Sequence, residues 1–170
     1  MKLFNSEYLN SLIEQAKFSP RQRQHRNIHL SYEEPCQRLF NAIEPTSYIR
    51  PHRHTVADKN ELLIAVRGLM AFITFDDDGE VGAVQHFGSE IYGGNVAVGV
   101  EVAPCTWHTV IALVDGSVLL EVKAGPFDSA RPKEMADWAP VEGGPDALVY
   151  LKHLRDVAKE NIEIGVGSEG

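Results

Sequence analysis

The chain has 170 residues, a formal net charge of −8, 44% hydrophobic and 8% aromatic residues, which suits one globular domain and excludes wholesale disorder. The negative charge disfavours nucleic acid and acidic membrane surfaces as partners, and no stretch approaches the roughly 20 apolar residues of a membrane span. Because no apolar run follows Lys2, the start does not resemble a secretory signal, and we expect a cytoplasmic protein.

The N-terminal segment predicts an amphipathic helix over residues 6–17. Ser6 is a plausible N-cap, and Pro20 prevents the helix from continuing. The apolar residues recur at helical spacing: Tyr8, Leu9, Leu12, Ile13 and Ala16.

A basic arm over residues 21–29 follows and is predicted to be a loop or an edge strand. It contains Arg21, Arg23 and Arg26 but no aromatic residue for base stacking, so it does not favour nucleic acid. The three arginines are candidates for binding an anionic group of a small ligand. The alternative is a surface or interface strand that acidic neighbours balance.

Short strands separated by turns dominate the next part of the chain. Asp76-Asp77-Asp78-Gly79 and Asp115-Gly116 are hairpin turn signals. This pattern is typical of a sandwich or barrel. Strands are expected at residues 38–43, 47–54, 62–66, 69–75, 81–87, 96–102, 106–113 and 117–123.

Beyond Gly125-Pro126-Phe127 the strand pattern stops. Residues 128–145 are expected to form an irregular strap over the barrel, and residues 146–161 a second amphipathic helix. We therefore divide the chain into an N-terminal helix and basic arm (1–35), a β-barrel (36–127), and a C-terminal strap and helix (128–170).

Four side chains have the chemistry and spacing of a metal site. Residues two apart on a strand share a face, so His52 and His54 can approach one ion from a single strand. Glu61 follows at the start of the next strand, and a proline-containing turn leads to His108. Three imidazoles and a carboxylate suit one divalent transition metal such as Zn, Fe, Mn or Ni, whereas a closed thiolate zinc site is disfavoured.

Strand parity adds further candidates around this site. Tyr48 and Arg50 would share the face of the two histidines, Tyr48 as an acid/base group and Arg50 as a contact for an anionic or hydroxyl-rich ligand. The alternative is that Arg50 pairs with an acidic residue and Tyr48 packs in the core. Glu121 is either an acid/base carboxylate inside the cavity or part of a solvent-facing pair with Lys123.

The spacing of His52, His54, Glu61 and Gly68 is similar to the first cupin signature, and Gly99, Pro104 and His108 resemble the second. More narrowly, residues 19–140 resemble the WbuC family of cupin-fold metalloproteins. The resemblance depends on segments 21–29, 48–54, 75–79, 106–109, 121–127 and 138–140.

This resemblance implies a mainly β protein with a single cupin barrel, that is, a double-stranded β-helix or jelly roll, with flanking N- and C-terminal helices. It also implies a bacterial protein associated with O-antigen or other surface-polysaccharide biosynthesis, whose ligand is a small sugar or nucleotide sugar. It does not supply a reaction.

Several functions stay open at this point. The metal could polarise a carbonyl or hydroxyl groups of a sugar, as in an isomerase or epimerase, or activate water or oxygen, as in a dioxygenase. A non-catalytic, metal-dependent binding or accessory protein is the alternative. Because unpaired barrel edges favour association, a homodimer is expected.

Overall fold

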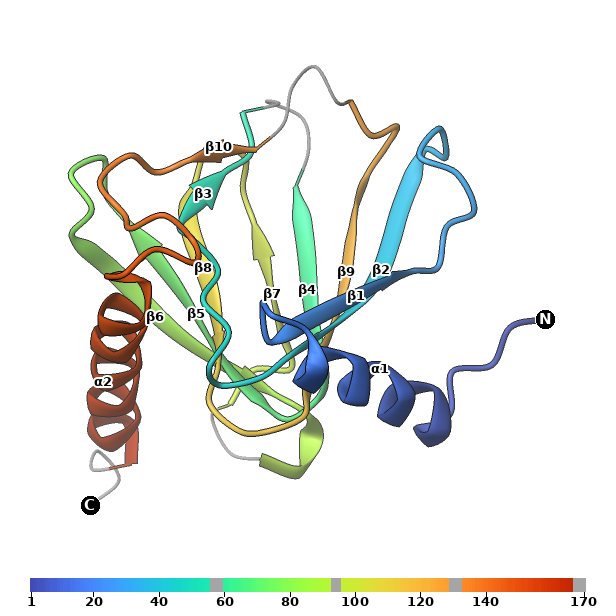
Figure 1. Ribbon diagram of the computed structural model, residues 1–170, viewed down its shortest axis with the longest axis horizontal. Helices are drawn as coiled ribbons and strands as arrows, with labels where there is room; N and C mark the ends of the chain where they lie inside the picture. The colour runs from blue at the N-terminus through green and yellow to red at the C-terminus, as the bar shows by residue number, and fades with distance from the viewer. Residues whose placement is uncertain (56–59, 93–95, 129–132, 167–170) are drawn as a thin grey trace.

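The computed structural model describes residues 1–55, 60–92, 96–128 and 133–166, with side chains to Glu160 in the last of these ranges. Two five-stranded sheets face each other, in the orders β1-β2-β9-β4-β7 and β10-β3-β8-β5-β6 (Figure 1). The elements are α1 (Ser6–Phe18), β1 (Arg23–Asn27), β2 (Cys36–Ile43), β3 (His52–Arg53), β4 (Glu61–Arg67), β5 (Leu69–Phe75), β6 (Val81–Gly88), a 3-10 turn (Glu90–Tyr92), β7 (Gly99–Val102), β8 (Trp107–Ala112), β9 (Ser117–Ala124), β10 (Glu134–Met135) and α2 (Ala147–Val166).

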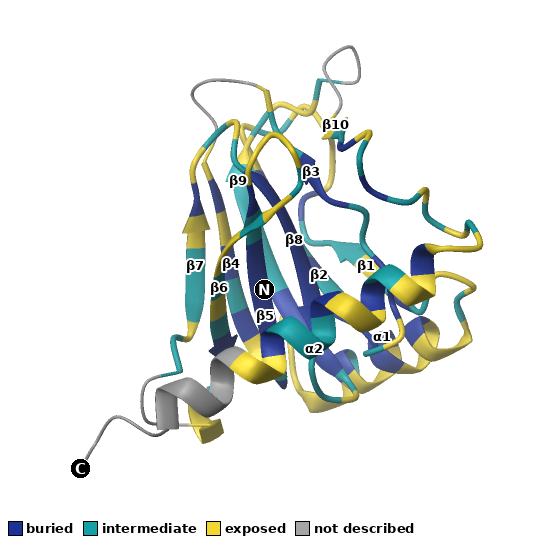
Figure 2. Ribbon diagram, turned by 90° about the vertical axis from the view of Figure 1, so that its left-hand side faces the viewer, coloured by how far each residue is buried: buried dark blue, intermediate teal, exposed yellow. Residues whose placement is uncertain are grey.

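Apolar side chains form three layers because strand residues alternate between the two faces of each sheet. Phe72 and Leu119 belong to the layer between the sheets. On the outside, Leu12 of α1 packs over Phe40 and neighbouring residues of the first sheet. Leu154 of α2 packs over the second sheet in the same way. Figure 2 shows the result: β5 and β8, inside the second sheet, are dark blue over most of their length, whereas β1 and β7, at the edges of the first sheet, are mostly teal.

The mainly β jelly-roll prediction, with a helix at each end of the chain, is confirmed. The basic arm contains β1, an edge strand, as one of the two alternatives foresaw. Asn5 caps α1 in place of the expected Ser6, because its side chain accepts a hydrogen bond from the Tyr8 amide. None of the helices in the described ranges has both the length and the apolar character needed to cross a membrane.

The strand predicted at 47–54 is wrong for most of its length, since only His52 and Arg53 form β3. Residues 44–51 instead cross between the sheets. Their carbonyl groups bond to side chains: Tyr48 O accepts from Arg23, and Ile49 O accepts from the Thr109 hydroxyl. Strand parity therefore does not apply before His52.

The strap holds a short strand that the sequence pattern did not indicate. Glu134 and Met135 of β10 pair with Arg53 and His52 of β3. The expected strand at 96–102 is also shorter, since β7 begins at Gly99.

Candidate metal centre and its cavity

A cavity of about 630 Å³ opens between the two sheets. Its inner part is apolar and includes Leu63 and Val110, whose side chains belong to the core layer between the sheets. The remaining wall is rich in polar and charged groups. These are Ser19, Arg21, Arg23, Gln24, His25, Gln37, Asn41, His52, His54, Glu61, His108, Glu121, Lys123, Asp128 and Lys133.

Three histidines meet on one wall of this cavity. His52 of β3 lies directly opposite His108 of β8, and His54 follows at the end of β3. One ligand nitrogen from each ring lies within 4.8 Å of the others. His52 and His108 are buried, whereas the His54 side chain is partly exposed.

Glu61 reaches the same point from the opposite sheet. Its Oε2 atom lies 3.5 Å from Nε2 of His54 and 3.6 Å from Nε2 of His108. Glu61 is itself buried and begins β4, so strand alternation directs its carboxylate inward together with Leu63. The structure thus brings together all four side chains that the sequence predicted as metal ligands.

Backbone contacts orient two of the imidazoles. Nδ1 of His52 lies 3.0 Å from the Arg50 carbonyl oxygen, and Nδ1 of His108 lies 2.8 Å from that of Thr106. A carbonyl oxygen only accepts, so each Nδ1 carries the proton and each Nε2 keeps its lone pair. Such contacts orient histidine ligands in metal sites.

The electrostatic environment also favours the ligand forms of these groups. Burial lowers the pKa of His52 well below its usual value, which keeps the ring neutral. Burial alone would raise the pKa of Glu61, but His108, His54 and Lys123 together hold it well below its usual range. Neutral imidazoles and an ionised carboxylate are the donor set that a first-row divalent ion prefers, so these residues fit one such ion.

Glu121 and Lys123 of β9 stand beside this group. Lys123 lies opposite Glu61 in the β4–β9 ladder, and its amine donates to both Glu61 and Glu121. Burial and repulsion from Glu61 raise the pKa of Glu121 to about 7. Glu121 therefore lies inside the cavity, as the prediction of an acid/base carboxylate had it. It is also paired with Lys123, as the alternative prediction had it, but this pair faces the cavity.

Tyr48 and Arg50 do not reach the cavity, which corrects the parity argument. The Tyr48 hydroxyl donates to the Pro140 carbonyl oxygen, and its ring packs against Tyr150 of α2. The Arg50 guanidinium donates to the Ala136 carbonyl oxygen. The physical reason is that both residues lie in the crossing segment, where side chains no longer alternate as on a strand.

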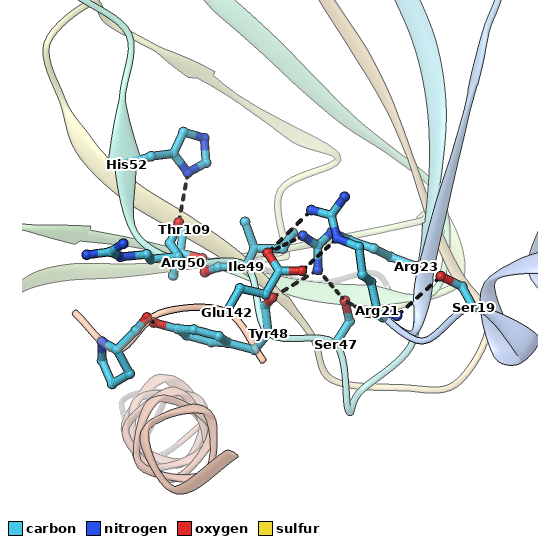
Figure 3. A network of polar contacts seen from close by, with 11 residues as sticks. Ser19, Arg21, Arg23, Ser47, Tyr48, Ile49, Arg50, His52, Thr109 and Glu142 are labelled. Carbon is cyan, nitrogen blue, oxygen red and sulfur yellow. Dashed lines mark hydrogen bonds and ion pairs between the residues drawn. The ribbon is translucent and has the colours of Figure 1, made fainter. Parts of the chain in front are cut away.

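The three arginines of the basic arm separate into two environments. Arg21 and Arg23 line the cavity, but both guanidinium groups bond to Glu142 of the strap, at 2.6 Å each (Figure 3). Arg26 faces the other way, where it donates to Ser11 and lies over the Tyr8 ring. Arg26 of β1 therefore packs against α1 and does not line the cavity.

Sequence reasoning missed three residues of the cavity region, namely Asn41, Lys133 and Glu142. Asn41 lies on β2 two residues from Leu39 and two from Ile43, which also line the cavity, so strand alternation could have placed it inside. Lys133 and Glu142 belong to the irregular strap, where no periodicity indicates which side chains face the barrel.

Comparisons with known proteins agree with this architecture. Protein SO0799 from Shewanella oneidensis aligns over 94% of this chain and 96% of its own, with a TM-score of 0.55 and 11% sequence identity. The capsular polysaccharide assembling protein CapF from Staphylococcus aureus aligns with a TM-score of 0.53 and 17% identity, over 69% of this chain. Both neighbours are cupin-fold proteins. This chain has the cupin fold.

The other comparisons are less informative. The chain spans only 32% of the length of CapF. Residues 4–87 match a family described as a domain of unknown function (DUF6016). No curated protein matches the chain. Within the cupin fold, the cavity described above occupies the space between the two sheets.

Proposed function

We propose that this cupin-fold protein holds one divalent transition-metal ion through His52, His54, Glu61 and His108, and uses it to bind and transform a small sugar-related molecule. One observation carries the proposal. Three imidazole nitrogens within 4.8 Å of one another, and a carboxylate within 3.6 Å of two of them, meet at the wall of a 630 Å³ cavity. A cavity of this size is in the range of small-molecule sites.

A bound ion would supply Lewis acidity toward a carbonyl or hydroxyl oxygen of the ligand. The residues around it would position that ligand, and Glu121 is the group best placed to hold a proton, because it lines the cavity next to Glu61. This arrangement supports an isomerase or epimerase over the dioxygenase alternative. The ion pair between Glu121 and Lys123 favours the second candidate, a non-catalytic metal-dependent binding protein.

Two similarities support a role in surface-polysaccharide biosynthesis. The chain resembles the WbuC family in the segments described above, and it shares its fold with a capsular polysaccharide assembling protein. We include in the proposal that the protein acts in the cytoplasm and as a homodimer.

The metal site is tested by elemental analysis of the purified protein and of three variants. Wild type is expected to contain about one transition-metal ion per chain, and His52→Ala and His108→Ala to lose most of it. His153→Ala is the matched control, because His153 lies exposed on α2 and should leave the metal content unchanged. Equal metal content in wild type and His108→Ala, or none in wild type, would contradict the proposal.

Substrate screening follows with the metal-loaded protein. Nucleotide sugars are incubated with wild type and with Glu121→Gln, and the products are separated by chromatography. Turnover by wild type that Glu121→Gln abolishes supports the enzyme. Binding without turnover supports the accessory protein.

A further inference from the structure

Among the described residues, the cationic side chains that line the cavity are ion-paired within the protein, with one exception. Arg21 and Arg23 share Glu142, and Lys123 is held between Glu61 and Glu121. This leaves Lys133 of the strap, which lines the cavity.

Lys133 keeps an exposed surface and also lines the cavity. Within the described ranges, its amine makes no hydrogen bond or ion pair. Desolvation and repulsion from Arg23 outweigh the attraction of Glu121 and Glu61 and lower the pKa of Lys133. A cation in such a place gains most from an anion that enters the cavity.

A second polar group on the cavity wall also lacks a partner. The Oδ1 atom of Asn41 is buried and accepts no hydrogen bond from any described residue. A buried acceptor without a donor costs about 1–3 kcal/mol in general, so such atoms are usually matched by water or a ligand. A hydroxyl group is a donor small enough to fill this role.

We propose that the cavity binds a polyhydroxylated anion, with its negative group on Lys133 and a hydroxyl group on Asn41. This inference rests on the proposed function, since the metal would hold another part of the same ligand. It narrows the ligand class to sugar acids and sugar phosphates, and it excludes neutral sugars as the preferred ligands. A carboxylate and a phosphate ester both provide the required charge.

The overall charge of the lined cavity points the same way. Four cationic side chains and three carboxylates line it, and a divalent ion at the histidines would add two positive charges. Glu142 offsets one of the arginines from outside the lining. The metal-loaded cavity is therefore positive, and an anion of one or two charges brings it close to neutrality.

The test is isothermal titration calorimetry of the metal-loaded protein with five probes: glucuronate, glucose 1-phosphate, glucose, acetate and inorganic phosphate. Glucuronate or glucose 1-phosphate should bind, and glucose at least about 10-fold more weakly, because it lacks the charge-assisted contact. The preference between the first two identifies the anionic group. Acetate and phosphate, which lack sugar hydroxyls, should bind more weakly than their hydroxylated counterparts.

Two variants connect the binding to the named residues. Lys133→Met should weaken the binding of the anionic sugars about 10-fold or more and reduce the salt dependence of that binding. The control Lys152→Met removes an exposed lysine on α2 and should change neither quantity. Asn41→Leu should weaken the binding of the hydroxylated anions but not that of acetate or phosphate. Its melting temperature should equal or exceed that of wild type.

Metal content, measured on the same preparations, separates the two proposals. A protein without metal contradicts the proposed function. A metal-loaded protein that binds none of the probes, that binds glucose as tightly as glucuronate and glucose 1-phosphate, or that is unaffected by Lys133→Met overturns the further inference alone.

Discussion

Replacing Arg23 by methionine should destabilise the protein far more than the same replacement at Arg21, although both side chains bond to Glu142. The two arginines differ in their surroundings. The Arg23 side chain is 9% exposed and that of Arg21 is 59% exposed. Arg23 also donates to Ser47 Oγ and to the Tyr48 carbonyl oxygen. Arg23 thereby connects β1, an edge strand of the first sheet, to the crossing segment and to Glu142 of the strap. The strap follows β10, which is an edge strand of the second sheet.

The magnitude follows from this difference in burial. An exposed ion pair contributes about 0–1 kcal/mol, so Arg21→Met should cost at most that amount. A hydrogen bond to a charged group contributes about 1.5–3 kcal/mol, and the loss of Arg23 also leaves a half-buried carboxylate with its exposed partner only. We expect Arg23→Met to cost about 3 kcal/mol, which lowers the melting temperature of a chain of this size by about 6–12 °C.

The assay is urea unfolding followed by circular dichroism, at pH 7 and at several lower pH values. Burial raises the pKa of Glu142, but the bonds from Arg21 and Arg23 outweigh this and hold it below its usual range. A carboxyl group whose pKa is depressed on folding stabilises the protein above its unfolded pKa of about 4.3, and this stabilisation is lost as the pH falls through the folded value. The stability difference between wild type and Glu142→Gln should therefore shrink below about pH 4.

Equal losses of stability for Arg21→Met and Arg23→Met would refute this reasoning, because burial would then not determine the contribution of either ion pair. A stability difference between wild type and Glu142→Gln that grows on acidification would refute the assigned sign of the pKa shift.

Three other predictions test the fold and the assignment of the cavity. Gly68 and Gly143 have nearly the same positive φ, +79° and +78°. A Cβ atom added at Gly68 would lie 2.3 Å from Ser117 Oγ, whereas one added at Gly143 would meet nothing within 4 Å. Gly143→Ala should cost about 1–2 kcal/mol from left-handed strain, and Gly68→Ala at least about 1–3 kcal/mol more in urea unfolding. Tyr48→Phe should lose about 1 kcal/mol of stability with its bond to Pro140, and calorimetry should find metal and ligand binding unchanged. Chelation of the metal should lower the melting temperature, but scanning calorimetry of the metal-free protein should still show one cooperative transition. Adding a metal ion at 100 times its Kd should raise the free energy of unfolding again by about 2.7 kcal/mol.

Much of the fold could be predicted because turns and alternation are local properties of the chain. The Asp76–Gly79 turn joins β5 to β6, which pair as predicted. The hairpin predicted at Asp115-Gly116 is wrong, because the turn joins β8 to β9 and these strands lie in different sheets. Alternation along β9 directs Glu121 and Lys123 to the same side as Leu119, into the cavity.

Alternation failed where the chain leaves the sheet. The segment before His52 contains Pro51, which has no amide hydrogen for a ladder, and its carbonyl oxygens bond to the side chains of Arg23 and Thr109. Whether a short segment is a strand or a crossing depends on such distant contacts. For this reason Tyr48 was predicted on the wrong side of the barrel.

The strap presents the same difficulty on a larger scale. Lys133 and Glu142 are placed by the pairing of β10 with β3 and by the ion pairs across the sheet edges. Neither contact has a local signature in the sequence. The metal ligands could be predicted because a spacing pattern exists for them, whereas residues that recognise one particular ligand follow no general pattern.

The origin of the four candidate ligands explains why metal loss should loosen one end of the barrel and leave the rest intact. His52, His54 and His108 come from one sheet and Glu61 from the other, so an ion bound to all four would join the two sheets. Without the ion, the buried Glu61 carboxylate still lies 3.5 Å from His54 and 3.6 Å from His108, and it still pairs with Lys123. The apolar layer between the sheets consists of other side chains, of which Phe72 stacks on His108. Hydrophobic burial there is independent of the metal, which is why unfolding should stay cooperative after chelation while the cavity loses its rigid wall.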